Sequence, residues 1–267
     1  MTLERSLNQR DHLDDFQVLT LTLLGKTKKV YVAGSGPAVI VMAEMPGISP
    51  HVARFARWVR DAGFTVYMPH LFGDDGAVPN PLSSIATIAR ACISAEFRAF
   101  SANASSPLTQ WLRALSALAH SECGGKGVGA IGMCFTGNFA LSMMLEKAVI
   151  APVLMQPSLP LQDAAGLHIS PAELATVKAR MQEQDLTVLA YRFAGDKFCK
   201  AQRFAAYEKA LDDRFCPRVL PDSAANPNTP MSNPHSVVTL HLIDEEGEPT
   251  RAARDEILEF FKLRLNS

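Results

Sequence analysis

Short, uninterrupted apolar runs alternate with segments of helical spacing, and this alternation constrains the fold more than any other feature of the sequence. Such runs between turn residues are typical of strands that are buried on both faces of a sheet. Between the first two runs, Val52, Phe55 and Val59 recur at helical spacing before a stop at Gly63. Parallel strands need such crossover segments, which cover both faces of the sheet. The runs lie at residues 38–43, 64–68, 128–133, 148–155 and 186–194.

We therefore predict an α/β fold, a three-layer αβα sandwich around a mostly parallel central sheet. Residues 16–23 and 28–32 also have strand character and precede the first buried run. Helices are expected after Ser170, which is suited to cap a helix N-terminus, and from about Thr250 onward. No break in composition and no internal repeat divides the chain, so we expect residues 1–267 to form a single domain.

Charge and composition exclude several classes of protein. The 26 Lys and Arg residues and the 27 Asp and Glu residues give a formal net charge of −1, so no basic excess is available for a nucleic-acid partner. No run approaches the ~18 consecutive apolar residues that a membrane span requires. Residues 1–15 lack the apolar core of a signal peptide. We therefore expect a cytoplasmic protein with neither a membrane nor a nucleic-acid partner.

The five cysteines include no CxxC pair, which argues against a disulfide framework or a zinc site. Cys134 has a distinct context, because it follows the apolar run 128–133 and precedes a segment of helical character. A sharp strand-to-helix turn presents a nucleophile at the carboxyl edge of a sheet. There the helix N-terminus stabilises a thiolate, and the backbone N–H of Phe135 is placed to donate to an oxyanion. We expect packing roles for the other cysteines, Cys92, Cys123, Cys199 and Cys216.

Residues 127–132 satisfy the G-x-G-x-x-G spelling of a dinucleotide site. These glycines precede a strand and lie within it, whereas a phosphate-binding turn must follow a strand and open a helix. Phosphate-loop, H-E-x-x-H and EF-hand motifs are absent from the sequence. We therefore expect no cofactor and no metal.

The segment around Cys134, Gly-Met-Cys-Phe-Thr-Gly at residues 132–137, resembles the G-x-C-x-G-G elbow of the dienelactone hydrolase (carboxymethylenebutenolidase) family. That family is a branch of the α/β-hydrolases in which cysteine replaces the usual serine. Thr136 departs from the pattern, because it stands where a glycine is usual. Residues 43–47, Ala-Glu-Met-Pro-Gly, are similar to the family's Q-E-I-F-G-like segment. The resemblance implies an α/β-hydrolase fold, a contact between Glu44 and the resting thiol, and a second oxyanion donor in the Met45 N–H.

Asp196 follows the apolar run 186–194, and His235 follows the next strand through a long polar loop, so both come in the order nucleophile, acid, histidine. The chemistry needs all three, because the imidazole takes the thiol proton and the carboxylate orients the imidazole. His241 is the competing histidine, but its apolar surroundings favour a packing role. Family members bind the carboxylate of an anionic lactone through arginines. Arg98 and Arg192 are the candidates for that role here, and Arg203 lies in a similar position, although no motif selects one of them.

The sequence thus predicts a hydrolase of a small ester or lactone, in which Cys134 attacks, His235 acts as general base and acid, and Asp196 orients the imidazole. Two alternatives remain open. One is a catalytically silent ligand-binding protein with the same fold, and the other is an acyltransferase or thioesterase that uses the same triad. Neither the identity of the substrate nor the oligomeric state follows from the sequence.

Overall fold

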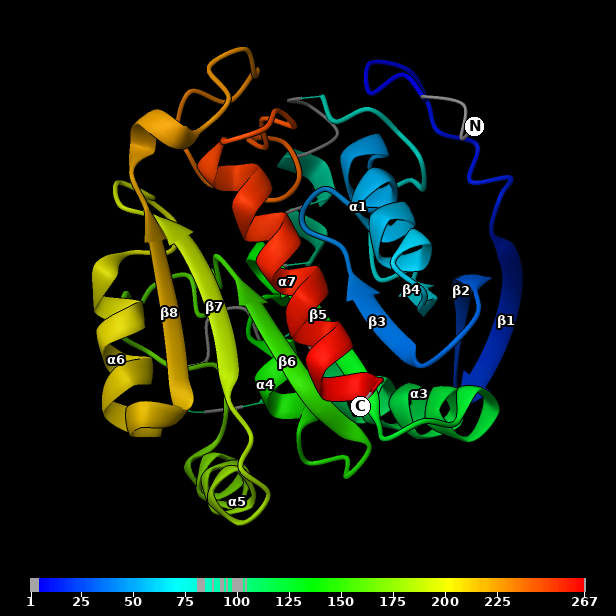
Figure 1. Ribbon diagram of the computed structural model, residues 1–267, viewed down its shortest axis with the longest axis vertical. Helices are drawn as coiled ribbons and strands as arrows, with labels where there is room; N and C mark the ends of the chain where they lie inside the picture. The colour runs from blue at the N-terminus through cyan, green and yellow to red at the C-terminus, as the bar shows by residue number, and fades with distance from the viewer. Residues whose placement is uncertain are drawn as a thin grey trace.

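The computed structural model describes residues 5–80, 85–87, 89–91, 94, 96–97, 103 and 105–266 (Figure 1). One sheet of eight strands runs through this part of the chain. The strands are β1 (Gln17–Leu23), β2 (Lys26–Gly34), β3 (Ala38–Met42), β4 (Thr65–Pro69), β5 (Val128–Met133), β6 (Val149–Met155), β7 (Val188–Phe193) and β8 (Phe215–Leu220). The helices are α1 (Pro50–Asp61), α3 (Leu108–Cys123), α4 (Phe139–Met143), α5 (Pro171–Glu183), α6 (Ala201–Leu211) and α7 (Pro249–Leu265).

The strands lie in the order β1-β2-β4-β3-β5-β6-β7-β8. β1 pairs antiparallel with β2, and β2 pairs antiparallel with β4, whereas all later neighbours are parallel. The five apolar runs of the sequence form β3 to β7, whose residues are almost all buried. The prediction of a mostly parallel sheet inside an α/β sandwich is therefore confirmed.

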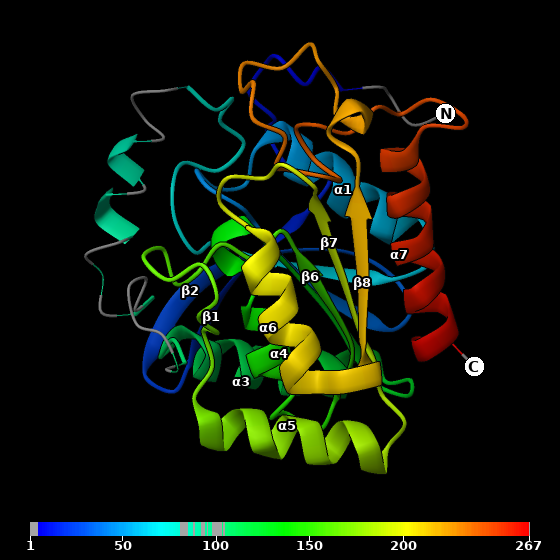
Figure 2. The same cartoon turned by 90° about the vertical axis from the view of Figure 1, so that its left-hand side faces the viewer.

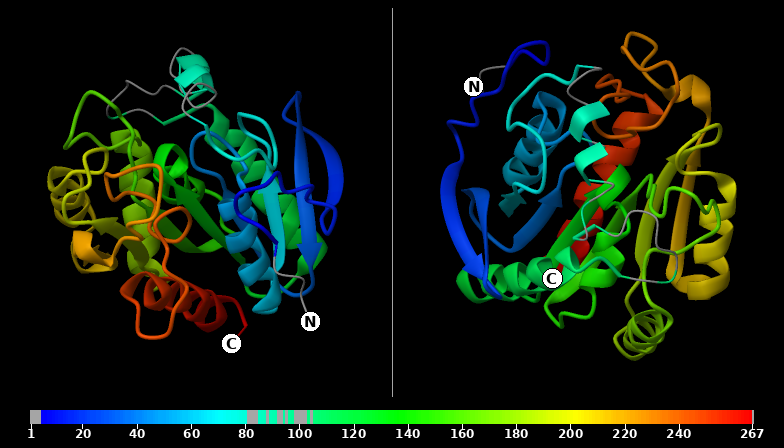
Figure 3. Two further views of the ribbon diagram at one scale, coloured as in Figure 1. Left: turned by 90° about the horizontal axis from the view of Figure 1, so that it is seen from above. Right: turned by 180° about the vertical axis from the view of Figure 1, so that it is seen from behind.

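Helices cover both faces of this sheet. α1 and α7 lie on the face turned to the viewer in Figure 1, and α3, α4 and α6 lie on the other face, as Figure 2 and the right-hand view of Figure 3 show. Phe55 of α1 and Phe261 of α7 are fully buried in the first layer, and Trp111 of α3 is buried in the second. As expected, Ser170 caps α5, because its hydroxyl accepts the Glu173 N–H at 3.3 Å. No helix of the described residues is long and apolar enough to cross a membrane.

The helix predicted after Cys134 is shorter than its sequence pattern suggests. A single 3-10 turn, η1 (Cys134–Thr136), comes first, and α4 extends only to Met143. Beyond it, Met144 and Glu146 make i→i−3 turn bonds instead of helical ones. The Arg180 guanidinium binds the carbonyls of both residues, so neither carbonyl is left to continue an α-helix.

The strand order locates a crevice. From β3 the chain continues to β4 on one side, whereas from β5 it continues to β6 on the other side. In open α/β sheets, ligands bind outside the carboxyl ends of the strands at such a switch point. The segment between β8 and α7 lies at the edge toward which β7 and β8 point (Figure 2). Residues that follow β3, β5 and β7 therefore meet this segment at one edge of the sheet.

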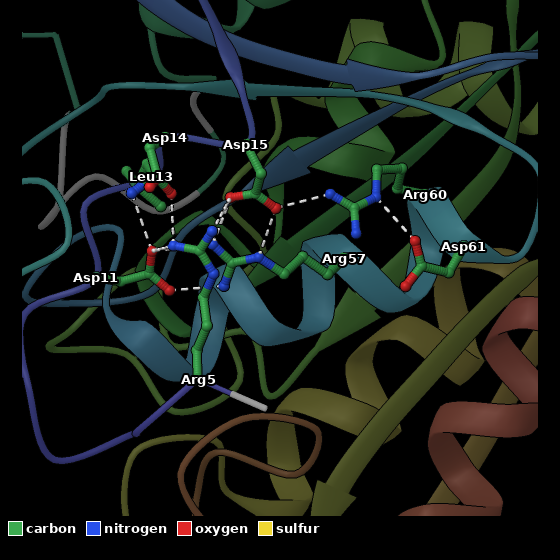
Figure 4. Close-up of polar contacts among 8 residues, drawn as sticks. All are labelled: Arg5, Asp11, Leu13, Asp14, Asp15, Arg57, Arg60 and Asp61. Atoms are coloured by element: carbon green, nitrogen blue, oxygen red, sulfur yellow. Dashed lines mark hydrogen bonds and ion pairs between the residues drawn. The ribbon is translucent and has the colours of Figure 1, made fainter. Parts of the chain in front are cut away.

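An ion-pair network connects the N-terminal segment to α1 (Figure 4). Arg57 of α1 lies between two carboxylates, at 2.6 Å from Asp11 and 2.7 Å from Asp15. Arg60 pairs with Asp15 at 2.7 Å, and Arg5 approaches both Asp11 and Asp15. The Asp11 side chain is only 1% exposed. Because charges that are removed from water need partners, this network fixes the path of the chain before β1.

Candidate active site

Cys134 is the first residue after β5 and lies at the turn into η1, as predicted. Its φ is +53°, a left-handed conformation that non-glycine residues seldom adopt outside tight turns. The turn is tightly packed, because a Cβ added to Gly132 would lie 2.1 Å from the Thr136 carbonyl oxygen, and one added to Gly137 would lie 2.6 Å from Pro157 Cα. Small residues at 132 and 137 therefore allow the sharp turn that exposes the half-buried thiol.

Thr136, which replaces the usual glycine, is fully buried and connects two strand ends. Its Oγ1 accepts the Met133 N–H at 2.9 Å. The same oxygen lies 3.1 Å from the carbonyl oxygens of Met42 and Ala43, at the end of β3. The departure from the family pattern thus places a hydroxyl donor between the Cys134 turn and the segment that leads to Glu44.

Asp196 and His235 form the predicted pair, with Asp196 Oδ2 at 2.7 Å from His235 Nδ1. Both residues are 3% exposed. The second carboxylate oxygen accepts the backbone N–H groups of Phe198 and Cys199 at 2.8 and 3.0 Å, so the carboxylate is held in one orientation. With a carboxylate on Nδ1, the proton of a neutral imidazole lies on that nitrogen, and Nε2 is free to act as a base.

The second ring nitrogen of His235, Nε2, faces the nucleophile. His235 Nε2 makes no hydrogen bond of ordinary geometry to a described residue. Burial lowers the pKa of His235, but the adjacent Cys134 sulfur and the Asp196 carboxylate raise it by more, so this pKa lies well above its usual value. The structure therefore brings Cys134, His235 and Asp196 together in the order that proton transfer requires.

Glu44 lies in the site but is engaged elsewhere. Its carboxylate accepts hydrogen bonds from Ser236 Oγ at 2.7 Å, Thr239 Oγ1 at 2.5 Å and Gln156 Nε2 at 3.3 Å. Burial raises the pKa of Glu44, although these bonds and the charge of His235 act in the opposite direction. Among the described residues, no hydrogen bond joins Glu44 to Cys134. The structure thus shows Glu44 bound to the His235 loop through Ser236 and Thr239, and the contact with the resting thiol that the resemblance implies stays a prediction.

The two predicted oxyanion donors follow the carboxyl ends of the neighbouring strands β3 and β5. Met45 follows Glu44, and its N–H donates no hydrogen bond to any described residue. Phe135 follows Cys134 directly, and its ring packs against Phe72 and Phe97, with centroids 6.2 and 5.3 Å apart. An N–H without a partner at this edge of the sheet suits the stabilisation of a transient negative charge. The roles of Met45 and Phe135 remain predictions.

Two of the three arginines considered from the sequence support loops. Arg192 is 6% exposed and donates to the carbonyls of Phe193, Ala194 and Cys199, at 2.9, 3.1 and 3.3 Å. These carbonyls lie at the end of β7 and in the loop that carries Asp196, which argues against carboxylate binding by Arg192. Arg203 is 1% exposed and likewise donates to four backbone carbonyls. Arg98 lies outside the described residues.

A cavity of about 850 Å³ lies near the Cys134 turn, although neither Cys134 nor His235 is among its lining residues. Pro46 and Gly47, which follow Met45, line it together with Phe72 and Phe97, the two rings that contact Phe135. The N-terminal residues 8–10 form part of its wall. Its size and its mixture of apolar and polar walls are those of a small-molecule site.

The sequence interpretation missed the residues that hold the histidine loop. Glu44 binds three of them: Ser236, Thr239 and Gln156. The fourth is His241, whose Nδ1 accepts the Ser236 N–H at 3.2 Å and whose Nε2 lies 2.9 Å from the Met231 carbonyl oxygen. His241 is buried, and burial lowers its pKa. This fits the packing role expected for it. The isolated polar residue Thr239 inside an apolar stretch was the one available signal, because a hydroxyl placed there needs a partner.

The comparisons with known proteins identify a family for this chain. The sequence matches the dienelactone hydrolase family over residues 22–220, which include Cys134 and Asp196, whereas His235 lies beyond the match. A search of curated protein sequences gives no match.

Solved structures share the fold. A dienelactone hydrolase-like promiscuous phosphotriesterase from metagenomic libraries is 18% identical, with a TM-score of 0.62 over 93% of this chain and 98% of that one. An α/β serine hydrolase without a lid from Xanthomonas campestris is 12% identical, with a TM-score of 0.56 over 95% and 97% of the two chains. A cold-adapted esterase from an Arctic intertidal metagenomic library is 13% identical, with a TM-score of 0.56 over 98% and 100%. With its α/β-hydrolase fold and its match over most of its length, this chain belongs to the dienelactone hydrolase family.

Proposed function

We propose that this hydrolase cleaves a small carboxylic ester or lactone through a thioester on Cys134. The observation that carries the proposal is the Asp196–His235 pair, whose free Nε2 is adjacent to the Cys134 sulfur at the strand-to-helix turn. Serine, cysteine and similar nucleophiles become reactive when such an oriented base removes their proton. A nearby cavity of about 850 Å³, lined by the two rings that contact Phe135, offers room for a small substrate.

In the first half of the reaction, Cys134 Sγ attacks the carbonyl carbon and its proton passes to His235 Nε2. The carbonyl electron pair moves onto oxygen, where the Phe135 and Met45 N–H groups stabilise it. Collapse of this intermediate breaks the bond to the alcohol oxygen, which leaves with the proton from His235.

In the second half, water attacks the thioester and gives its proton to His235. Asp196 stabilises the imidazolium that forms in both halves, because its oxygen stays 2.7 Å from Nδ1. The acid then leaves and the proton returns to the Cys134 sulfur. Glu44 takes no part in proton transfer and supports the histidine through Ser236 and Thr239.

The test compares wild-type protein with Cys134→Ala on p-nitrophenyl acetate and on a dienelactone. We expect the variant to lose at least 10³-fold in kcat/KM, in line with the loss of a nucleophile. The partly exposed Cys216 of β8 supplies the matched control, because Cys216→Ala removes a thiol elsewhere. Mass spectrometry of the acylated Cys134 peptide after a rapid quench would detect the thioester directly. Equal turnover by wild type and Cys134→Ala would refute the assignment.

A further inference from the structure

We propose that Thr136 is a positioning residue, whose hydroxyl sets the spacing between the two backbone segments that bind the oxyanion. This inference rests on the proposed function, because it assigns the two N–H groups of Phe135 and Met45 to the same transient charge. Phe135 lies on the Cys134 turn, and Met45 lies three residues beyond the end of β3. The oxyanion requires both donors at hydrogen-bond distance at once.

The hydroxyl of Thr136 reaches both segments. On the turn side it accepts the Met133 N–H at 2.9 Å, one residue before the nucleophile. On the β3 side it lies 3.1 Å from the carbonyl oxygens of Met42 and Ala43, which precede Glu44 and Met45. The Met133 carbonyl oxygen, on the turn itself, also lies 3.1 Å from this hydroxyl. A threonine hydroxyl has one proton, so it can receive the N–H and donate to one of the three carbonyls, and donation to Met42 or Ala43 is the bond that joins the two segments.

A glycine at this position has no hydroxyl and leaves the Met133 N–H and the β3 carbonyls without this side-chain bridge. The surroundings give the hydroxyl no freedom, because Thr136 is fully buried and its backbone carbonyl lies against Gly132. Here a side chain therefore connects the two segments directly. A small shift of a donor is costly in catalysis, since misplacement by about 1 Å reduces rates by around 10²-fold.

The variant Thr136→Val keeps the size and branching of the side chain and removes the hydroxyl. We expect its kcat for p-nitrophenyl acetate to fall by roughly 10- to 100-fold, with KM within about twofold, because the lost interaction acts on the transition state. Thr136→Ser restores the hydroxyl and should return kcat to within about threefold of wild type. Thr136→Gly, the residue usual in the family, should behave like the valine variant.

Thr65→Val is the matched control. Thr65 is buried and its hydroxyl donates to the Gly36 carbonyl at 2.7 Å, but it begins β4 at the opposite edge of the sheet. The same atomic change there should leave kcat within about twofold of wild type, whatever its effect on thermal stability.

Two probes of the thiol separate positioning from a general structural role. An aryl trifluoromethyl ketone adds to the thiol, forming an S–C bond and an oxyanion, so its affinity reports on the two donors. Alkylation by iodoacetamide displaces iodide and forms no oxyanion. Thr136→Val should lower the affinity for the ketone by the same factor as it lowers kcat. It should change the rate of alkylation by less than about twofold.

Three results would overturn the inference: a valine variant with wild-type kcat, a serine variant as impaired as valine, or equal losses in ketone affinity and alkylation rate. If Cys134→Ala retained full activity, the proposed function itself would fail, and the behaviour of Thr136 variants toward the ketone would no longer bear on catalysis. The two failures are thus distinguished by the Cys134 variant alone.

Discussion

Replacing Arg57 with methionine is expected to destabilise the protein by about 3 kcal/mol, because it leaves the buried Asp11 carboxylate without its main partner. The guanidinium lies 2.6 Å from Asp11, whose side chain is 1% exposed, and 2.7 Å from Asp15, which is 24% exposed. Breaking a buried pair by removal of one partner costs roughly 3–5 kcal/mol. The lower value applies here because Arg5 remains 3.5 Å from Asp11 and 3.4 Å from Asp15.

Urea or thermal unfolding of the purified variants measures this loss. For a chain of this size, about 3 kcal/mol corresponds to a decrease in Tm of roughly 6–12 °C. Lys178→Met removes one partner of the more exposed pair with Asp212 and should cost less than about 1 kcal/mol. The double variant Arg57→Met/Asp11→Asn should recover part of the loss, because it also removes the buried charge. An Arg57→Met protein as stable as Lys178→Met would refute the reasoning.

The same ion-pair network should make the stability of the protein depend on pH in the acid range. Burial raises the pKa values of Asp11 and Asp15, but the bonds and charges of Arg57, Arg60 and Arg5 and the Leu13 N–H together outweigh burial and leave both pKa values below the ordinary 3.8. A carboxyl whose pKa is lowered by folding stabilises the fold above its unfolded pKa, and this stabilisation disappears as the pH falls through the folded pKa. The difference in stability between wild type and Arg57→Met should therefore be complete at neutral pH and shrink below about pH 4.

Three further predictions concern the site. Asp196→Asn should lower kcat by roughly 10²- to 10⁴-fold, because the amide no longer stabilises the imidazolium, and a loss below tenfold in an ester assay would contradict this role. Glu44→Gln should leave the rate of iodoacetamide alkylation at Cys134 within about twofold of wild type, since Glu44 binds Ser236, Thr239 and Gln156; a large acceleration would show that Glu44 restrains the thiol. Folding raises the pKa of His235, so its protonated form stabilises the fold. This stabilisation is complete below about pH 6.5 and is lost as the pH rises through the folded pKa. Unfolding of wild type and His235→Gln at pH 6 and pH 9 should therefore show a smaller difference at the higher pH.

Much of the site could be predicted because its parts follow strand ends. Cys134 and Asp196 come directly after apolar runs, and parallel strands bring their carboxyl ends to one edge of a sheet. The hydrogen-bond partners of Glu44 could not be predicted in this way. Ser236 and Thr239 follow Glu44 by 192 and 195 residues. The path of the loop determines these contacts, and no local sequence pattern predicts that path.

The arginines show a second limit of sequence reasoning. Arg192 lies on β7, near the edge of the sheet where the site forms, so a role in substrate binding was reasonable. Its buried guanidinium instead donates to the carbonyls of Phe193, the last residue of its own strand, and Ala194, the first residue after it. A loop's unpaired carbonyls become visible only when its backbone path is known, because strand and helix patterns say nothing of loop hydrogen bonds.

The bonds between Glu44 and the His235 loop also affect when the site assembles. Each bond joins two residues that are separated by 192 or 195 positions in the sequence. The entropic cost of closing such a long loop must be overcome before these bonds can stabilise the fold. During synthesis, β3, β5 and Cys134 are made well before His235. A growing chain therefore carries the thiol without its base, and the reactive pair forms only when the segment after β8 folds onto the finished sheet.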